Sequence, residues 1–242
     1  MSYVPYTKEF TVLAGTIDDF GEMSTAQPMR LVIVGAGGHG KEVAAYVSDI
    51  DHRTGSIDLV GFVDESRELG DFGGSKVIGD FEALKGRGFS TEGLRFITAV
   101  GDNSVRKQLA EKAVSHGLGS WTLVHNDAYV GVSAGIGGGT CIAPGSVVTV
   151  DVDIGRHCIV NVNASISHDC NIGDYSNINP NAVVCGNVEI GEGGYIGAGA
   201  VVREKVKIGA WSVVGAGAAV LANIPDGATV VGVPARVVDT RT

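Results

Sequence analysis

The chain has 242 residues, which is long enough to bury a sizeable core in one or two domains. Its formal net charge of −9 argues against a nucleic-acid partner, because binding to phosphates along a strand needs a basic face. The four cysteines have no CxxC or metal-ligand spacing, so we expect no metal. No segment has the pattern of a signal peptide or of a membrane insertion, and we expect a cytoplasmic protein.

The N-terminal part of the chain has the pattern of alternating strands and helices. Residues 1–28 show no clear hydrophobic period and are expected to form an N-terminal extension with weak order. RLVIVG then predicts a strand, GAGGHG a turn, KEVAAYVSDI an amphipathic helix and LVGFVD a second strand, which together form a βαβ unit. Further on, DFEALKG predicts a short helix, LRFITAVG a strand and SVRKQLAEKAVSHG a longer helix. We expect one small domain over residues 29–117.

The turn from Gly35 to Gly40 has the spacing GxGxxG between a strand and a helix. Glycines let the backbone approach a phosphate closely, and the free N–H groups at the start of a helix attract anions. Asp64 ends the second strand, near the place where a dinucleotide site holds a ribose. A tight turn without a ligand is the alternative, because this motif alone is weakly specific. Residues 30–117 are too few for both halves of a dinucleotide domain, so one nucleotide-diphosphate group fits better than NAD.

The C-terminal part of the chain has an aliphatic residue at every sixth position. The residue two before each of them, from Ala128 to Ala218, is small. Neither a helix nor an alternating strand has a period of six, whereas a hexapeptide repeat predicts a parallel β-helix whose axis is filled by the aliphatic side chains. We expect this domain over residues 118–242. The aliphatic series is Val124, Val130, Ile136, Ile142, Val148, Ile154, Val160, Ile166, Ile172, Ile178, Val184, Ile190, Ile196, Val202, Ile208, Val214 and Val220.

The sequence Ser-His168-Asp169-Cys170 stands out among the small and aliphatic residues of the repeat. An imidazole takes up a proton near neutral pH, and an adjacent carboxylate raises its basicity. From the residues alone, His168 is either a catalytic base or an exposed residue of the coil. Cys170 falls on the small inward position and is expected to be a buried hydrophobe. The other histidines, including His125 and His157, are expected to be solvated at the surface.

Several motifs follow one another in a specific order: VGAGGHGKEV, GFVDES, GDNSVRKQL, ISHDCNIGDYS, CGNVEIG and a closing VVGVPARVV. In this combination the chain resembles the NeuD/PglD-like family of sugar acetyltransferases over roughly residues 29–239. The resemblance implies the fold class α/β plus β-helix, in which a small Rossmann-like N-terminal domain binds a nucleotide-linked sugar and a left-handed parallel β-helix of hexapeptide repeats follows. It also implies a homotrimer, with acetyl-CoA as co-substrate in the clefts between neighbouring β-helices.

The resemblance implies roles for individual residues as well. His168 would be the general base, and Asp169 would be the acidic neighbour that increases its basicity. Family members often have a second histidine where this chain has Asn177, and an amide can donate a hydrogen bond to a thioester carbonyl but cannot carry a proton. Acetyl-CoA would contact Asn177, Gly186, Ala198 and Ala216. The nucleotide sugar would contact Gly37, Gly38, His39, Asp64, Glu65 and Gly101.

The mechanism that we expect is direct acetyl transfer from acetyl-CoA to the amine of a nucleotide-linked amino sugar. His168 would accept the proton of the amine, and a backbone N–H or Asn177 would stabilise the oxyanion. A covalent route through Cys170 is disfavoured by the inward position of its thiol. The alternative acceptor is a sugar hydroxyl, as in O-acetylation of the sialic-acid type. A hydroxyl is far less acidic than a protonated amine, so its activation requires a stronger base.

Two other classes of protein compete with an acetyltransferase. A β-helix is often purely structural or a binding module, but then the His-Asp step and the glycine-rich turn would have no purpose. An NAD-dependent oxidoreductase would need a second nucleotide-binding half, which the sequence lacks. We therefore expect an enzyme.

Overall fold

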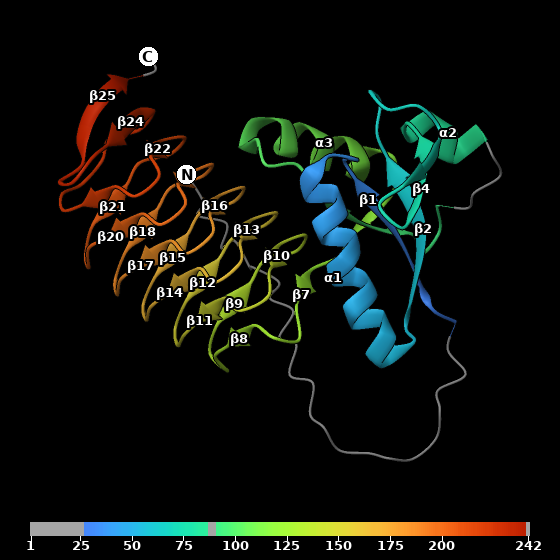
Figure 1. Cartoon of the computed structure of the whole chain (residues 1–242), viewed down its shortest axis with the longest axis horizontal. Helices are drawn as coiled ribbons and strands as arrows, with labels where there is room; N and C mark the ends of the chain where they lie inside the picture. Colours follow the sequence, from blue (N-terminus) through green and yellow to red (C-terminus); the bar gives the residue numbers. More distant parts are fainter. Residues whose placement is uncertain (1–26, 87–90, 241–242) are drawn as a thin grey trace, which may run out of the picture.

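The N-terminal part of the protein is a six-stranded sheet with helices packed on it (Figure 1). The structure is a computed structural model that describes residues 27–86 and 91–240. The strands lie in the order β3-β4-β2-β1-β5-β6, and all neighbours are parallel except β3 and β4. The elements are β1 (Met29–Val34), α1 (Gly38–Thr54), β2 (Ile57–Val63), β3 (Gly70–Phe72), β4 (Ser75–Gly79), α2 (Phe81–Gly86), β5 (Arg95–Thr98), α3 (Asn103–Ser115) and β6 (Gly119–Ser120).

The predicted βαβ unit corresponds to β1, α1 and β2, and the later strand and helices are also present. Aspartates fix two of the helix starts: Oδ1 of Asp80 accepts the N–H of Ala83 at 2.8 Å, and Oδ1 of Asp102 accepts that of Val105 at 2.9 Å. The sequence analysis did not predict the hairpin of β3 and β4, whose turn is a pair of glycines with positive φ. None of the helices in the described ranges is long and apolar enough to cross a membrane.

Residues 123–240 form a left-handed parallel β-helix with three faces. The first face consists of β7 (Leu123–Val124), β10 (Cys141–Ile142), β13 (Ile159–Val160), β16 (Asn177–Ile178), β19 (Tyr195–Ile196), β22 (Val213–Val214), β24 (Ala228–Val231) and the antiparallel β25 (Arg236–Thr240). The second face consists of β8 (Tyr129–Val130), β11 (Val147–Val148), β14 (Ser165–Ile166), β17 (Val183–Val184), β20 (Val201–Val202) and β23 (Ala219–Val220). The third face consists of β9 (Gly135–Ile136), β12 (Asp153–Ile154), β15 (Asn171–Ile172), β18 (Glu189–Ile190) and β21 (Lys207–Ile208).

The aliphatic series predicted from the sequence forms the core of this β-helix. Every member from Ile136 to Val220 is buried, and only Val124 and Val130 in the first coil are partly exposed. The small residues two positions earlier are buried from Thr140 to Ala218, among them Cys170 at 2% exposure, whereas Ala128 and Ala134 in the first coil are partly buried. The axis therefore holds one aliphatic side chain per face in every coil, as the period of six predicted.

The backbone turns at a corner between one face and the next. One residue of many corners has the left-handed conformation, for which glycine, asparagine and aspartate are best suited. Asp169 is such a residue, with φ 58°. The non-glycine residues of this kind are Asp151, His157, Asn163, Asp169, Tyr175, Asn181, Asn187, Lys205 and Trp211. His168 and Asp169 lie between β14 of the second face and β15 of the third face. They therefore belong to the corner between these two faces, where side chains project outward.

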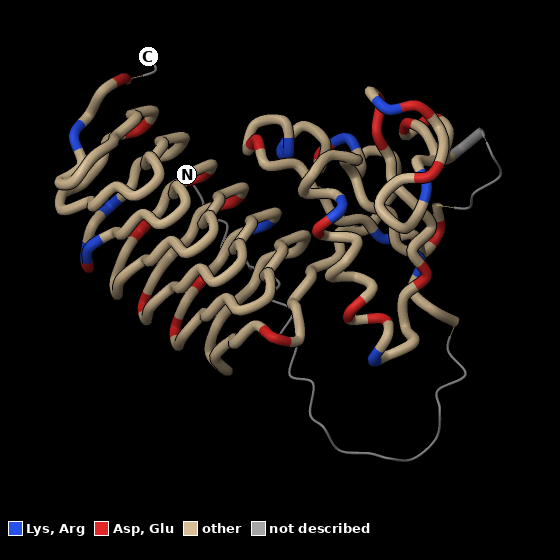
Figure 2. The backbone as a smooth tube through the Cα atoms, viewed as in Figure 1, with Lys and Arg blue, Asp and Glu red and all other residues tan. Residues whose placement is uncertain are grey.

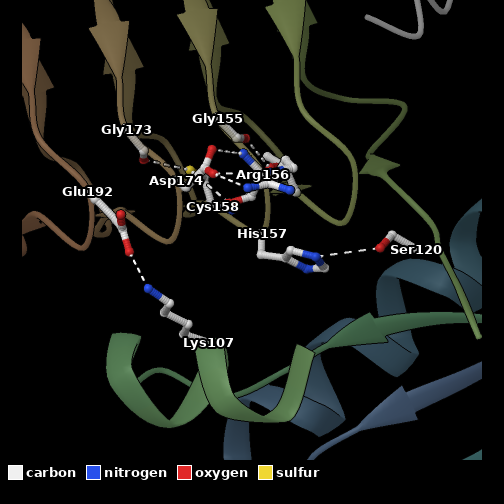
Figure 3. Close-up of polar contacts among 10 residues, drawn as sticks. Lys107, Ser120, Gly155, Arg156, His157, Cys158, Gly173, Asp174 and Glu192 are labelled. Atoms are coloured by element: carbon white, nitrogen blue, oxygen red, sulfur yellow. Dashed lines mark hydrogen bonds and ion pairs between the residues drawn. The ribbon is translucent and has the colours of Figure 1, made fainter. Parts of the chain in front are cut away.

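The N-terminal sheet and its helices pack on the first face of the β-helix. One apolar cluster joins Tyr46 and Val47 of α1 to Leu123 and Cys141 of the first coils. Farther along the β-helix, Figure 3 shows Lys107 reaching from α3 toward Glu192, with 2.7 Å between Nζ and Oε1. The two parts of the chain thus share a continuous interface rather than a linker alone.

The prediction that His157 and His125 are solvated at the surface is wrong. His157 is 5% exposed and its ring stacks between those of Phe96 and Tyr175, at centroid distances of 5.7 and 5.6 Å. His125 is 4% exposed and lies edge-on to Tyr46. Both belong to corners or strand ends that the N-terminal part covers, and the repeat pattern contains no information about that cover.

Candidate active site

His168 and Asp169 form a hydrogen-bonded pair on an exposed corner. Nδ1 of His168 is 2.7 Å from Oδ2 of Asp169, and the two side chains are 57% and 54% exposed. A carboxylate at Nδ1 favours the tautomer with its proton on that nitrogen, which leaves Nε2 as the free acceptor. The pair can therefore accept a proton from a bound substrate and stabilise the imidazolium that results.

Gly186 lies one coil beyond His168 on the same corner. A Cβ at this glycine would lie 2.6 Å from Cε1 and 2.7 Å from Nε2 of His168. The backbone N–H of Asn187 also donates to the carbonyl of His168 at 2.9 Å. The absence of a side chain at Gly186 thus leaves the space in which the imidazole lies.

Cys170 is buried beside this pair and points into the coil. Its Sγ lies 3.1 Å from the carbonyl oxygen of Cys185 and 3.6 Å from that of His168. Burial raises the pKa of the Cys170 thiol, which disfavours the thiolate needed for nucleophilic attack. These contacts disfavour a covalent route through Cys170.

The glycines of the N-terminal turn divide into two kinds. A Cβ at Gly40 would lie 2.3 Å from the carbonyl oxygen of Gly35, and Gly35 itself has φ 109°, so these two glycines are required by packing and conformation. A Cβ at Gly37 or Gly38 would meet no atom within 4 Å. Gly37 caps α1 without a side-chain hydrogen bond, so this open helix start is available to an anion.

Asp64 organises the glycine turn. Its Oδ2 accepts the backbone N–H of Ala36 at 2.7 Å, and its Oδ1 accepts that of Ser66 at 2.8 Å. Burial alone would raise the pKa of Asp64, but the hydrogen bonds from Ala36 and Ser66 outweigh it and lower the pKa. Asp64 is therefore an ionised acceptor that connects the end of β2 to the turn after β1.

The other two predicted side chains of the substrate site already have partners. Nδ1 of His39 is 2.9 Å from Oε2 of Glu42, while its Nε2 is buried and has no hydrogen-bond partner among the described residues. Glu65 forms an ion pair with Lys112 of α3. The Nε2 of His39 is thus unpaired among the described residues, but it is not exposed to a ligand in this structure.

A cavity of about 260 Å³ lies where β1, β2 and α3 meet, beyond the end of β5. Its wall is mostly apolar with carboxylates and a hydroxyl group at one side, which suits a ring system with a polar edge. The residues around it are Gly35, Val63, Asp64, Glu65, Ser66, Phe81, Val100, Val105 and Leu109. The structure therefore brings together Asp64 and Glu65, with Gly101 next in sequence to Val100. Within the described part of the chain, no group of three His, Cys, Asp or Glu side chains is placed to hold a metal ion.

Asn177 belongs to β16 on the first face, next to the loop of Val100 and Gly101 and away from His168. Its side chain is 2% exposed, and Nδ2 donates to the carbonyl of Gly101 at 2.7 Å. Its Oδ1 is buried without a partner among the described residues. Within one chain, Asn177 thus contacts a residue expected at the nucleotide sugar instead of the His-Asp pair.

Ala198 and Ala216 are exposed on the corner between the first and second faces. They belong to successive coils, as the backbone N–H of Gly217 donates to the carbonyl of Ala198 at 2.9 Å. The second face separates this corner from the corner of His168 and Gly186. The four residues expected at acetyl-CoA therefore do not form one cluster in a single chain.

The predicted substrate site and the predicted base lie on opposite sides of the β-helix. A corner between the second and third faces of a triangular coil is opposite the first face, and the N-terminal sheet covers the first face. A single chain therefore does not bring His168 to the cavity near Gly101.

Sequence reasoning missed Arg106, which is 0% exposed at the interface between α3 and the β-helix. Arg106 belongs to the GDNSVRKQL motif, and this motif was the one feature of the sequence that pointed to it. Its neighbours Lys107 and Gln108 are equally polar, so the helical pattern does not single it out.

Comparisons with known proteins agree with both halves of this architecture. Residues 30–113 match the PglD N-terminal domain, and residues 169–204 match the bacterial transferase hexapeptide (six repeats). The acetyltransferase domain of PglB from Neisseria gonorrhoeae FA1090 is 37% identical, with a TM-score of 0.79 over 87% of this chain and 100% of that one. The chain belongs to the NeuD/PglD-like family of sugar acetyltransferases.

Other solved members of this NeuD/PglD-like family have the same fold. PerB from Caulobacter crescentus, in complex with CoA and GDP-perosamine, is 32% identical with a TM-score of 0.78 over 90% of this chain and 99% of that one. WeeI from Acinetobacter baumannii AYE is 27% identical with a TM-score of 0.77 over 87% of this chain and 100% of that one. A comparison with curated proteins finds no match.

Proposed function

We propose that this protein transfers an acetyl group from acetyl-CoA to the amine of a nucleotide-linked amino sugar. The observation that carries the proposal is the pair of His168 and Asp169, an imidazole with a free Nε2 on an exposed corner of a hexapeptide β-helix. Two relatives support the substrates: the PglB domain has been solved with acetyl coenzyme A, and PerB with CoA and GDP-perosamine. Residues 29–117 would hold the nucleotide sugar, and residues 118–242 would carry out the transfer.

The chemistry needs one base and no covalent enzyme intermediate. Nε2 of His168 accepts a proton as the sugar nitrogen attacks the thioester carbonyl carbon and the C–N bond forms. Asp169 stabilises the imidazolium, and a backbone N–H at the cleft stabilises the oxyanion. The C–S bond then breaks, and the departing sulfur takes the proton from the imidazolium. Asn177 has no role in this step, because its Nδ2 donates a hydrogen bond to the carbonyl of Gly101.

The faces of the β-helix support a homotrimer. The outward side chains of the second face are largely apolar, with Tyr129, Val147 and Val201 exposed at 59%, 37% and 43%. The third face instead carries charged residues, including the ion pair of Lys207 and Glu189 at 2.9 Å. Figure 2 shows that much of the β-helix backbone has neither acidic nor basic residues. An exposed apolar face marks a contact surface, so we place the second face against neighbouring chains.

A trimer would also complete the active site. His168 would face the substrate cavity of a neighbouring chain, since its own cavity lies on the far side of the β-helix. The cleft between two chains would place the corner of His168 and Gly186 beside the partner's corner of Ala198 and Ala216, with acetyl-CoA between them. This arrangement uses surfaces that a single chain leaves separated.

The product of the reaction tests the proposal. The protein would be incubated with acetyl-CoA and a panel of nucleotide-linked amino sugars that differ in base and sugar, and thiol release would be measured. Mass spectrometry before and after mild alkali would then identify the acetylated atom. An acetyl group that survives alkali is the expected amide, whereas an alkali-labile ester would show acetylation of a hydroxyl. Absence of thiol release with every member of the panel would contradict the proposal.

A further inference from the structure

Arg106 of α3 connects the N-terminal sheet to the β-helix through hydrogen bonds. Its Nε donates to the carbonyl of His157 at 2.9 Å, Nη2 to that of Tyr175 at 2.6 Å and Nη1 to that of Val100 at 2.8 Å. Burial lowers the pKa of Arg106 to about 10, which leaves it charged at neutral pH. A buried cation is costly unless its donors are satisfied, and here backbone carbonyls from three segments satisfy them. A lysine has no rigid fork that reaches all three.

Two asparagines strengthen the same connection. Nδ2 of Asn177 donates to the carbonyl of Gly101 at 2.7 Å, and Nη1 of Arg106 lies 3.4 Å from the same oxygen. Nδ2 of Asn103, the first residue of α3, donates to the carbonyl of Gly193 at 2.9 Å. The loop after β5 is therefore held to two neighbouring coils of the β-helix by side chains from both parts.

This loop borders the cavity expected to hold the nucleotide sugar. Val100 lines the cavity, and the backbone N–H of Ala99 donates to the carbonyl of Val34 at 2.8 Å, next to the glycine turn. A displacement of the loop would change both the shape of the cavity and its position relative to the β-helix. The sugar amine must lie within hydrogen-bond distance of the base, so small displacements matter.

We propose that Arg106 and Asn177 are positioning residues, which fix the loop of Val100 and Gly101 and with it the nucleotide-linked sugar on the first face of the β-helix. This inference rests on the proposed function, because it takes the cavity beside the loop as the sugar-nucleotide site. It assigns Asn177 to the nucleotide sugar in place of the contact with acetyl-CoA that the family resemblance implies.

The test separates the two substrates kinetically. Asn177→Ala removes one hydrogen bond, so the KM for the nucleotide amino sugar should rise roughly 3- to 10-fold while the KM for acetyl-CoA stays within about twofold. Arg106→Lys should have an effect of the same direction. The matched control is Asn179→Ala on the same face, because Nδ2 of Asn179 donates at 2.8 Å to the carbonyl of Ile196 within the β-helix. The control should leave the KM for the nucleotide amino sugar unchanged.

Hydrogen exchange gives a second readout that does not depend on turnover. Amides of residues 99–104 should exchange faster in Asn177→Ala than in Asn179→Ala, with the Tm of each variant measured beside it. A rise in the KM for acetyl-CoA instead would overturn the inference, as would a lower Tm with both KM values and the exchange unchanged. Failure of the wild-type protein to bind any nucleotide amino sugar in calorimetry would instead contradict the proposed function, whatever the exchange of the loop.

Discussion

The imidazole of His168 lies in the space that a side chain at Gly186 would fill, since a Cβ there would be 2.6 Å from its Cε1. Gly186→Ala should therefore displace the ring from its position beside Asp169. Gly186 has no positive φ, so the fold should tolerate the change. We expect kcat to fall roughly 10- to 100-fold, because misplacement of a catalytic group by about 1 Å costs that much.

The control for this variant is Gly138→Ala, where a Cβ would meet only Cβ of Ser120 at 3.8 Å. Steady-state kinetics and the Tm should be measured for both variants. Unchanged kcat in Gly186→Ala with an unchanged Tm would show that the observed ring position has no part in catalysis.

Substitution of the base itself should have a larger effect. His168→Ala should lower kcat roughly 10²- to 10⁴-fold, the usual contribution of a general base, and leave acetyl-CoA affinity nearly intact. Asp169→Asn should be milder, because the amide still contacts Nδ1 and asparagine suits φ 58° at this corner. Activity of His168→Ala within about threefold of the wild type would contradict the role of His168 as the general base.

The core of the β-helix could be predicted from the sequence because its geometry repeats. Each coil places the same kind of residue at the axis, so Ile136 and Val220 obey one rule and both are buried. The rule also places His168 and Asp169 outside the core, on a corner. These predictions need only local periodicity and the size of the side chains.

The interface with the N-terminal part could not be predicted in this way. His157 occupies a corner position just as His168 does, yet Phe96 and Tyr175 enclose its ring while His168 is exposed. Burial of Arg106 depends on carbonyls that are far away in sequence. Pairing between distant segments follows from tertiary packing, which a single sequence does not reveal. The same holds for the position of Asn177 against Gly101.

The two kinds of glycine in the N-terminal turn should respond differently to substitution. Gly38→Val places its side chain in open space, so it should spare the Tm and raise the KM for the nucleotide sugar roughly tenfold by blocking the phosphate. Gly40→Ala would place Cβ 2.3 Å from the carbonyl oxygen of Gly35, so it should lower stability by about 1–3 kcal/mol. Thermal melts and KM values for both substrates distinguish the two effects. Equal loss of acetyl-CoA binding in Gly38→Val would point to misfolding.

A charge on the second face should dissociate the assembly. Val201→Asp would introduce a carboxylate on a face that we place between chains, and an unpaired charge there disfavours association. We expect a lower mass by light scattering, loss of activity and an unchanged circular dichroism spectrum. The control is Val114→Asp on α3, outside the β-helix, where the residue is 55% exposed; this variant should keep both mass and activity. A fully active monomer, whether of the wild-type protein or of Val201→Asp, would contradict an active site shared between chains.

The buried ring of His157 should make the stability of the protein depend on pH. Burial, with smaller contributions from Arg156 and Arg106, lowers the pKa of His157 from 6.5 to about 4. Between these values the unfolded chain binds a proton that the folded chain does not, so the free energy of unfolding decreases as the pH falls. The contribution of His157 to the free energy of unfolding is fully present above pH 7, and at pH 5 the loss should be about 2 kcal/mol.

His157→Phe removes this proton while keeping an aromatic ring between Phe96 and Tyr175. Its corner has φ 52°, and Tyr175 and Trp211 show that aromatic residues occupy such corners in this protein. Chemical denaturation at several pH values between 5 and 8 should give a free energy of unfolding that falls less steeply toward pH 5 in the variant than in the wild type. The difference should vanish above pH 7, because His157 is then neutral in both the folded and the unfolded chain. Parallel curves across the whole range would show that His157 is protonated equally in the two states.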